Sequence, residues 1–339
     1  MLNVVLFFLM VSLLLYVILA GADFGAGIVE LFSTKKNQQL TKKTIYRVMG
    51  PVWEANHIWI IILVVILWVG FPEFYNVLVV YLHIPLTLVL LGITMRGVAF
   101  VFRHYDAFKD KSQILYDWMF RFSSLVTPIF LGMTAGSMLS GQLVITDDYA
   151  NYSFIDLFVQ PWFNGFSILV GVFFASLCAF LASILLIGES HANDRKVYVT
   201  KSEKATAAVV GIGFIVICYG FYHNITFVTD FIKNPLTVGL VILSFILIFP
   251  LIISIKKAKK VTTRLLAGIQ VTLILVAAFV THFPVLIIAY NKNINLLETA
   301  SPEKVINVLG ISLIIGGLII LPGLFHLMKS FKMIKVLDD

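Results

Sequence analysis

Charged residues are scarce in this sequence. Asp, Glu, Lys and Arg make up 13% of the 339 residues, whereas 60% are hydrophobic. Soluble domains carry about twice that share of charge, and a soluble chain of this length has no interior that could bury so much apolar surface. The shortage of charge therefore excludes an ordinary soluble domain and predicts a protein whose solvent is the lipid bilayer.

Several chemical signatures are also missing. The two cysteines, Cys178 and Cys218, lie in apolar stretches without CxxC or Cys/His spacing, so we expect small buried apolar residues. There is no Walker motif, zinc-protease motif or nucleophile elbow. The formal charge is +7, but no aromatic and basic platform lies outside the apolar stretches, which argues against nucleic-acid binding. The N-terminus lacks a basic segment and a cleavage site, so Leu2 to Ala20 is expected to span the membrane uncleaved.

Apolar stretches of spanning length dominate the rest of the chain. A helix needs about 20 residues to cross the hydrocarbon core, irregular backbone cannot face lipid, and these runs are too continuous for the strands of an outer-membrane barrel. We therefore expect an all-α polytopic membrane protein with nine transmembrane helices. The stretches cover residues 2–31, 52–72, 77–101, 117–139, 163–187, 206–226, 237–255, 265–288 and 305–328.

The basic residues predict the orientation in the membrane. Of the 25 Lys and Arg residues, 21 follow the first, third, fifth, seventh and ninth stretches. The alternate connections contain only Lys233, Lys292 and Lys304. The positive-inside rule then places the N-terminus outside and the C-terminus in the cytoplasm. A count of eight or ten helices would break this alternation.

The same alternation suggests an internal organisation. The first four and the next four helices would each begin and end outside, which is consistent with two four-helix bundles and one peripheral helix. We expect a first unit with the polar cluster (residues 1–139), an external loop (140–162), a second unit (163–288), and a ninth helix with a cytoplasmic tail (289–339).

Charged residues inside the first three stretches are candidate functional residues, because charge in hydrocarbon is costly. Asp23 lies in Gly-Ala-Asp-Phe-Gly-Ala-Gly (21–27), Glu54 in Pro-Val-Trp-Glu-Ala-Asn-His-Ile-Trp (51–59), and Arg96 in Thr-Met-Arg-Gly-Val-Ala-Phe (94–100). The topology brings all three to the cytoplasmic third, and consecutive helices are usually neighbours. We therefore expect one cluster of Asp23, Glu54, His57 and Arg96. Gly21, Gly25 and Gly27 would let another helix approach closely.

The cluster has two interpretations that the residues leave open. Arg96 could neutralise a carboxylate and fix helix packing, or Asp23 and Glu54 could relay protons, as buried acids do in pumps. Glu54 and His57 share a helix face, and histidine titrates near neutral pH, which slightly favours the relay. Haem ligation is not indicated, because no two histidines show a paired spacing among His57, His83, His223, His282 and His326.

The polar motifs resemble those of subunit II of cytochrome bd-type quinol oxidases. The resemblance rests on the glycine-rich motif around Asp23, on the Trp53-Glu54 motif followed by an apolar run ending in Phe71-Pro72, and on Arg96-Gly97 followed by an aromatic residue and Arg103. The pairs Asp117-Trp118 and Phe283-Pro284 also fit, with less specificity. Length, nine helices and an external N-terminus extend the resemblance over the whole chain.

The resemblance implies a function beyond what composition indicates. Such an enzyme of the bacterial cytoplasmic membrane oxidises quinol and reduces dioxygen to water with protons from the cytoplasm. Subunit I would bind haem b, haem d and the quinol, while subunit II would bind no haem, stabilise subunit I and contribute acids to a proton path. Small accessory subunits are possible partners. The implied path residues are Asp23, Glu54 and His57, with Arg96, Asn56 and Trp53 as structural partners.

Two alternatives use the same residues differently. A proton-coupled secondary transporter would also place acids in the membrane, although its site is expected at the midplane rather than near one face. A purely structural subunit would need the charges only for packing.

Overall fold

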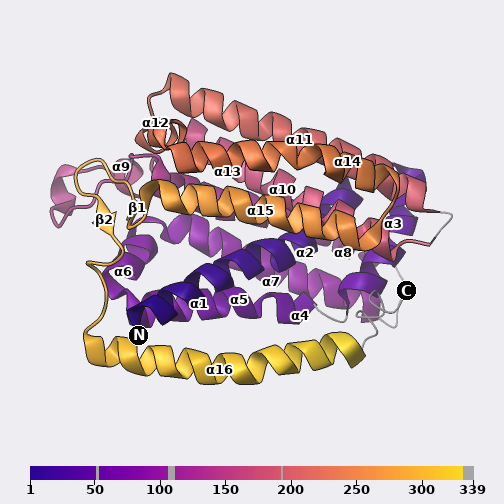
Figure 1. Cartoon of the computed structure of the whole chain (residues 1–339), viewed down its shortest axis with the longest axis horizontal. Helices are drawn as coiled ribbons and strands as arrows, with labels where there is room; N and C mark the ends of the chain where they lie inside the picture. Colours follow the sequence, from indigo (N-terminus) through magenta and orange to yellow (C-terminus); the bar gives the residue numbers. More distant parts are fainter. Residues whose placement is uncertain (51–52, 106–110, 192–193, 331–339) are drawn as a thin grey trace.

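Helices make up nearly all of the regular structure. The computed structural model describes residues 1–50, 53–105, 111–191 and 194–330 (Figure 1). In these ranges eight helical segments are long and apolar enough to cross a membrane, as expected from the continuous hydrophobic stretches. They are α1–η1–α2 (Leu2–Leu31), α7 (His83–Tyr105), α8 (Ser112–Leu139), α10 (Gly165–Glu189), α11 (Arg195–Tyr222), α13–α14 (Pro235–Ile246 and Ile248–Lys256), α15 (Lys260–His282) and α16 (Glu303–Ser330).

The second expected stretch is divided in the structure. It contains α4 (Trp53–Asn56) and α5 (Ile58–Gly70), and the chain then turns into α6 (Pro72–Tyr81), which is bent from α5 by 115°. Proline at the first position of α6 favours a new helix there. The count becomes nine if the bent pair is taken as one span. The third stretch, expected over 77–101, is displaced to α7 because α6 takes up its first residues.

The first span is not a uniform α-helix. A π-helical turn, η1 (Tyr16–Ala20), joins α1 (Leu2–Leu15) to α2 (Gly21–Leu31) immediately before the glycine-rich motif. Isolated π-turns widen the helix locally and occur frequently at functional sites. This turn precedes the buried Asp23 by one helical turn.

Helix α10 lies at the centre of the packing. Its most extensive contacts are with α2, α8 and α11, whereas α16 packs mainly on α1 and α5 (Figure 1). A Cβ on Gly132 of α8 would lie 2.7 Å from the Cα of Gly171 on α10, so only glycine permits this approach. The two groups of helices expected from hydropathy are therefore in direct contact through α10.

Short elements cap one end of the molecule. They are η2 (Tyr149–Asn151), α9 (Phe154–Phe158), α12 (Thr226–Lys233), and the antiparallel pair β1 (Val285–Ile287) and β2 (Ile294–Asn295). The eighth stretch was expected to be helical to residue 288, but α15 ends at His282 and Pro284 follows. Proline has no N–H for the helix, so the chain leaves as a strand.

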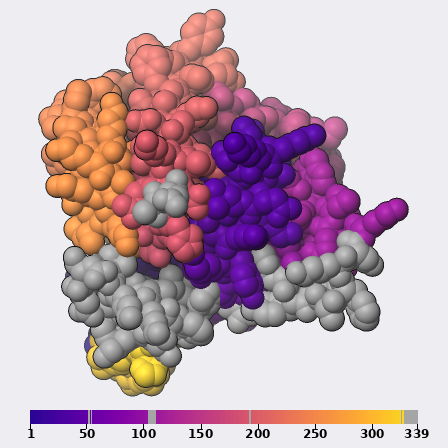
Figure 2. Space-filling view, turned by 90° about the vertical axis from the view of Figure 1, so that its right-hand side faces the viewer, coloured from indigo at the N-terminus to yellow at the C-terminus, as the bar shows by residue number. Residues whose placement is uncertain are grey.

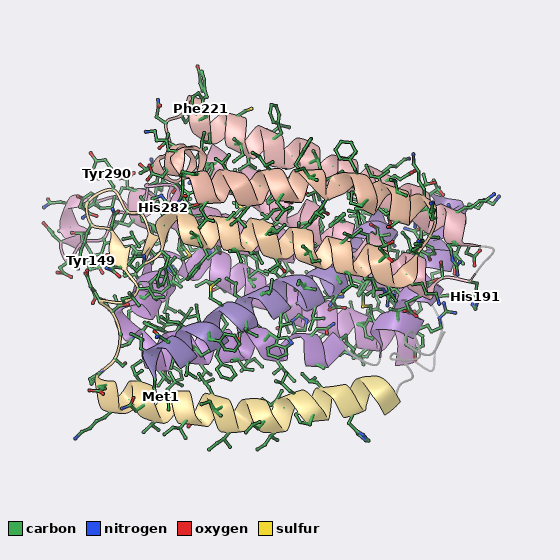
Figure 3. The ribbon with its side chains drawn as sticks, viewed as in Figure 1. Met1, Tyr149, His191, Phe221, His282 and Tyr290 are labelled. Atoms are coloured by element: carbon green, nitrogen blue, oxygen red, sulfur yellow. The ribbon has the colours of Figure 1, made fainter. Side chains whose placement is uncertain are left out.

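Tyr149, His282, Tyr290 and Met1 lie toward this end, and His191 lies at the opposite end (Figure 3). The opposite end also contains α3 (Lys35–Met49), the amphipathic helix between the first two spans (Figure 1). The strongly basic connections are therefore on the side away from the N-terminus.

Candidate functional site

The centre of the site is a fully buried ion pair between α2 and α7. Asp23 is 0% exposed, and its Oδ2 lies 2.5 Å from Nη1 of Arg96. Arg96 also donates from Nη2 to the Asp23 carbonyl at 2.8 Å and from Nε to Ser124 Oγ of α8 at 3.0 Å. Its guanidinium lies 5.1 Å from the ring centroids of both Phe24 and Phe120. Three helices are thus joined by one side chain.

His57 completes the cluster from the break between α4 and α5. Its Nε2 is 3.7 Å from Asp23 Oδ2, within ion-pair range but longer than a direct hydrogen bond. The ring lies 5.6 Å from the Phe24 ring and 6.3 Å from the Tyr16 ring. His57 lies between the end of α4 and the start of α5 and is the N-cap residue of α5, so the break in the span places an imidazole beside Asp23.

The other predicted residues of the second motif surround this group. The Trp53 ring packs 5.4 Å from the ring of Phe100 on α7. Asn56 is buried and lines a cavity. The Glu54 backbone belongs to α4, and its side chain lies outside the described part of the structure. The structure therefore places Asp23, His57 and Arg96 in contact and leaves the predicted position of the Glu54 carboxyl untested.

Several polar atoms in this region have no hydrogen-bond partner among the described residues. They are Asp23 Oδ1, His57 Nδ1, the Tyr16 hydroxyl and Trp59 Nε1, all buried. Of these residues Trp59 lines a cavity of about 260 Å³, together with Ala22, Asn56, Glu189 and Arg264. Buried polar atoms of this kind are usually satisfied by internal water.

Sequence reasoning missed a second ion pair on the same two helices. Glu30 is 1% exposed, and its two carboxylate oxygens lie 2.6 and 2.7 Å from Nη2 of Arg103. Glu30 follows Asp23 by seven residues, and Arg103 follows Arg96 by seven. Seven residues make about two helical turns. Glu30 therefore lies on the same face of α2 as Asp23, and Arg103 lies on the same face of α7 as Arg96. This repeated spacing was the signal that could have found Glu30.

Further ion pairs connect Arg103 to the end of the molecule that contains α3. Arg103 Nε lies 2.8 Å from Asp117 Oδ1 on α8, and Lys42 Nζ of α3 lies 2.6 Å from the same oxygen. The Arg103 guanidinium is 4.5 Å from the Phe120 ring, which therefore lies between the two buried arginines. Figure 2 looks onto this end, where α3 (indigo) lies between the starts of α11 (red) and α8 (magenta). We name Asp23, Arg96, Glu30, Arg103 and Asp117 the charged ladder.

The three glycines predicted to allow close packing are not equivalent. A Cβ on Gly25 would lie 1.8 Å from the Cys178 carbonyl oxygen of α10, and one on Gly27 would lie 2.2 Å from Ser124 Oγ of α8. A Cβ on Gly21 would meet Leu181 and Cys178 side chains at 3.4 and 3.6 Å, which are ordinary contacts. Gly25 and Gly27 therefore hold α2 against two helices at once.

The surroundings of His57, His223 and His282 do not fit axial haem ligation. His57 Nε2 faces Asp23 between two aromatic rings. His282 Nε2 faces Asp230 at 3.2 Å and stacks on Phe227, and His223 lies against Tyr219 with ring centroids 4.3 Å apart. Among the described residues no three His, Cys, Asp or Glu side chains are grouped to hold a metal ion. The described residues of the cluster hold buried charge in the form of ion pairs.

The chain is similar to known oxidase subunits over nearly its whole length. A family model described as cytochrome bd terminal oxidase subunit II matches residues 1–331. Cytochrome bd ubiquinol oxidase subunit 2 of Bacillus subtilis (strain 168) is 27% identical over 82% of this chain and 80% of its own length. Cytochrome bd-I ubiquinol oxidase subunit 2 of Escherichia coli (strain K12) is 24% identical over 56% of this chain and 51% of its own length.

The fold is also shared with a solved structure. A chain in the structure of bd oxidase from Geobacillus thermodenitrificans aligns with a TM-score of 0.75 and 18% identity, covering 97% of this chain and 98% of that chain. These matches do not favour the secondary transporter considered above. The chain belongs to the family of cytochrome bd terminal oxidase subunit II and is a multi-pass membrane subunit of a respiratory oxidoreductase.

Proposed function

We propose that this chain is the haem-free subunit of a quinol-oxidising, dioxygen-reducing complex in the bacterial cytoplasmic membrane, that it stabilises subunit I, and that it passes protons from the cytoplasm. The names of the similar proteins, ubiquinol oxidase subunits, support the quinol substrate. Membership in a subunit II family implies a subunit I partner. Haem b and haem d are assigned to that partner, and they supply the oxygen chemistry when bound there.

The observation that carries the proton-transfer proposal is the contact of His57 with the buried Asp23. The imidazole lies 3.7 Å from a carboxylate that is fully enclosed, and each group has an atom without a protein partner among the described residues. At this separation a small rotation of the imidazole brings Nε2 within direct hydrogen-bond distance of the carboxylate, which proton transfer requires. Arg96 holds the Asp23 carboxylate in place, and the proposed proton path consists of Glu54 in α4, His57 at the break in the span, and Asp23.

The proposal is tested with Glu54→Gln and His57→Phe in the purified oxidase complex. Both variants keep side-chain size while removing the titrating group. We expect quinol-dependent oxygen consumption to fall by about 10²-fold, a typical contribution of a positioned proton donor or acceptor. Haem content per complex, measured optically, should stay unchanged, because neither residue is assigned to a haem.

His83→Phe is the matched control. This histidine lies at the other end of the molecule, where its Nδ1 contacts the Val80 carbonyl at 2.8 Å, so its loss should leave turnover unchanged. Normal turnover in both test variants would reject the relay and leave the charged groups with a packing role. Loss of haem together with activity would show that the variants act on assembly instead.

A further inference from the structure

A lateral groove separates α11 from the helices that carry the site. It has a volume of about 390 Å³ and is formed by α2, α8, α10 and α11. Its walls are apolar along most of their length, with Ile28 and Val29 from α2, Ile129 from α8, and Val172 and Ala175 from α10. Phe32 is 76% and Val172 is 37% exposed, so the groove is open to the side of the molecule that faces lipid.

Two lysines lie at one end of the groove. Lys201 and Lys204 are on the first turns of α11, at the same end as α3, and Ile212 lies two to three turns farther along the helix. The eleven residues from Lys201 to Ile212 correspond to about 16 Å of helix, roughly half of the hydrocarbon thickness. The groove therefore runs from the basic end of the molecule toward the middle of the membrane. Its length matches the thickness of one leaflet.

The charge of these lysines is not neutralised by the described residues. Lys201 Nζ donates to Ser33 Oγ and Thr41 Oγ1, both at 2.7 Å, and both acceptors are uncharged hydroxyls. Glu30, on the same helix as the groove wall, is already paired with Arg103. No ion pair of either lysine occurs in the described ranges. Lys201 is half-buried and Lys204 is exposed at the mouth of the groove, and a half-buried cation without a carboxylate partner favours an anionic ligand.

We propose that the groove binds one anionic phospholipid of the cytoplasmic leaflet. Its phosphate is bound by Lys201 and Lys204, and one acyl chain lies along the apolar walls to the level of Ile212. Basic pockets between transmembrane helices on the cytoplasmic side are suited to anionic headgroups, and lysine can extend its stem along apolar surface to reach them. This binding site is independent of the proton relay, because none of its residues belongs to the Asp23–His57 group.

The test measures the lipid retained by the purified oxidase complex. The complex is stripped by detergent, reconstituted in nanodiscs of either phosphatidylglycerol or phosphatidylcholine, re-extracted, and examined by native mass spectrometry. We expect the unmodified complex to retain one phosphatidylglycerol and no phosphatidylcholine. Lys201→Gln with Lys204→Gln should lower this retention by about tenfold or more, since each lysine near a headgroup contributes a several-fold change. Lys35→Gln with Lys36→Gln, on exposed residues of α3, should retain the lipid normally.

A second pair of variants addresses the acyl chain without changing charge. Ala208→Phe fills the groove one turn beyond Lys204 and should reduce retention, whereas Ala207→Phe, on the adjacent exposed position outside the groove, should not. Equal retention in all variants, or retention of both lipids alike, would overturn the proposal. Displacement of the bound species by inorganic phosphate alone would also overturn it, because the acyl chain would then contribute nothing.

Discussion

Arg96 shows how one side chain can make a charged site tolerable inside a membrane. A charge in hydrocarbon is costly unless it is paired and hydrogen-bonded. Three of its guanidinium nitrogens have protein acceptors, and its two faces lie near aromatic rings. The planar fork of arginine allows this set of contacts, and lysine could not reproduce it.

The Asp23–Arg96 pair predicts a non-additive effect on stability. Asp23→Asn or Arg96→Gln alone should destabilise the complex by about 3–5 kcal/mol, because each leaves an uncompensated buried charge. The double variant should recover part of this loss, because no lone charge remains. Thermal unfolding of the three purified variants measures the difference. Strictly additive losses would mean that the two residues act separately.

Glu30 and Arg103 illustrate what residue-level reasoning missed. The sequence motifs include Arg103 but give it no partner, and they do not include Glu30, because both residues lie at helix ends where a charge is ordinary. In the structure both are almost completely buried. Asp117 enters the motifs only as part of the Asp117-Trp118 pair, but in the structure it lies inside α8 and contacts both Arg103 and Lys42. Burial at a helix end depends on neighbouring helices, which a single stretch does not reveal.

At the scale of elements, α2 depends on glycine on two different faces. The Gly25 face meets α10 and the Gly27 face meets α8. Without a strong hydrophobic drive between helices in lipid, such close approach supplies much of the association through packing. The position of Asp23 between these glycines is therefore fixed by backbone contacts on both sides.

Gly25→Ala and Gly21→Ala form a matched pair that tests this packing. Gly25→Ala would bring a methyl group to 1.8 Å from the Cys178 carbonyl oxygen, so α2 and α10 must separate. We expect a loss of about 1–3 kcal/mol or more in stability. Gly21→Ala has room and should be neutral or slightly stabilising, by up to about 1 kcal/mol from helix propensity. Thermal stability of the two purified complexes gives the comparison, and equal effects would contradict the packing argument.

The interruptions at η1 and at His57 belong to the same scale. No glycine or proline marks η1 in its sequence Tyr16–Ala20, whereas the second interruption coincides with the polar residues Asn56 and His57. Hydropathy predicts where a span lies, but the exact path of its backbone depends on what packs beside it.

The whole molecule has two chemically different ends. The described basic residues of α3, of the start of α11 and of the α14–α15 connection gather at the His191 end. The opposite end contains Tyr149 and Tyr290 and few cations (Figure 3). Asn291 links the two outer loops there, since its amide exchanges hydrogen bonds with the backbone of Ile145 at 3.0 and 2.6 Å.

The charge asymmetry predicts the orientation of the protein in the cell. Tyr149→Cys should react with a membrane-impermeant maleimide in right-side-out membranes, and His191→Cys should react only in inverted vesicles. The natural cysteines provide an internal control, because Cys178 is buried and Cys218 lies within a span. The reverse labelling pattern would place the N-terminus in the cytoplasm.

By itself the sequence determined the class of the protein, the position of most spans and the resemblance to oxidase subunits. These features follow from local composition and motifs, since a long apolar run must cross the membrane wherever its neighbours lie. Asp23, His57 and Arg96 were also brought together by topology alone, because their depth follows from where each lies in its span.

Only the tertiary structure decided how these residues are used. In the structure Gly25 and Gly27 have no room for a methyl group, whereas Gly21 does. Glu30 and Arg103 are buried, and α6 is bent away from α5. A groove lies beside Lys201 and Lys204. Each of these features arises between helices that are distant in the chain. The rotation and separation of two packed helices depend on both surfaces together, and no single stretch of sequence contains that information.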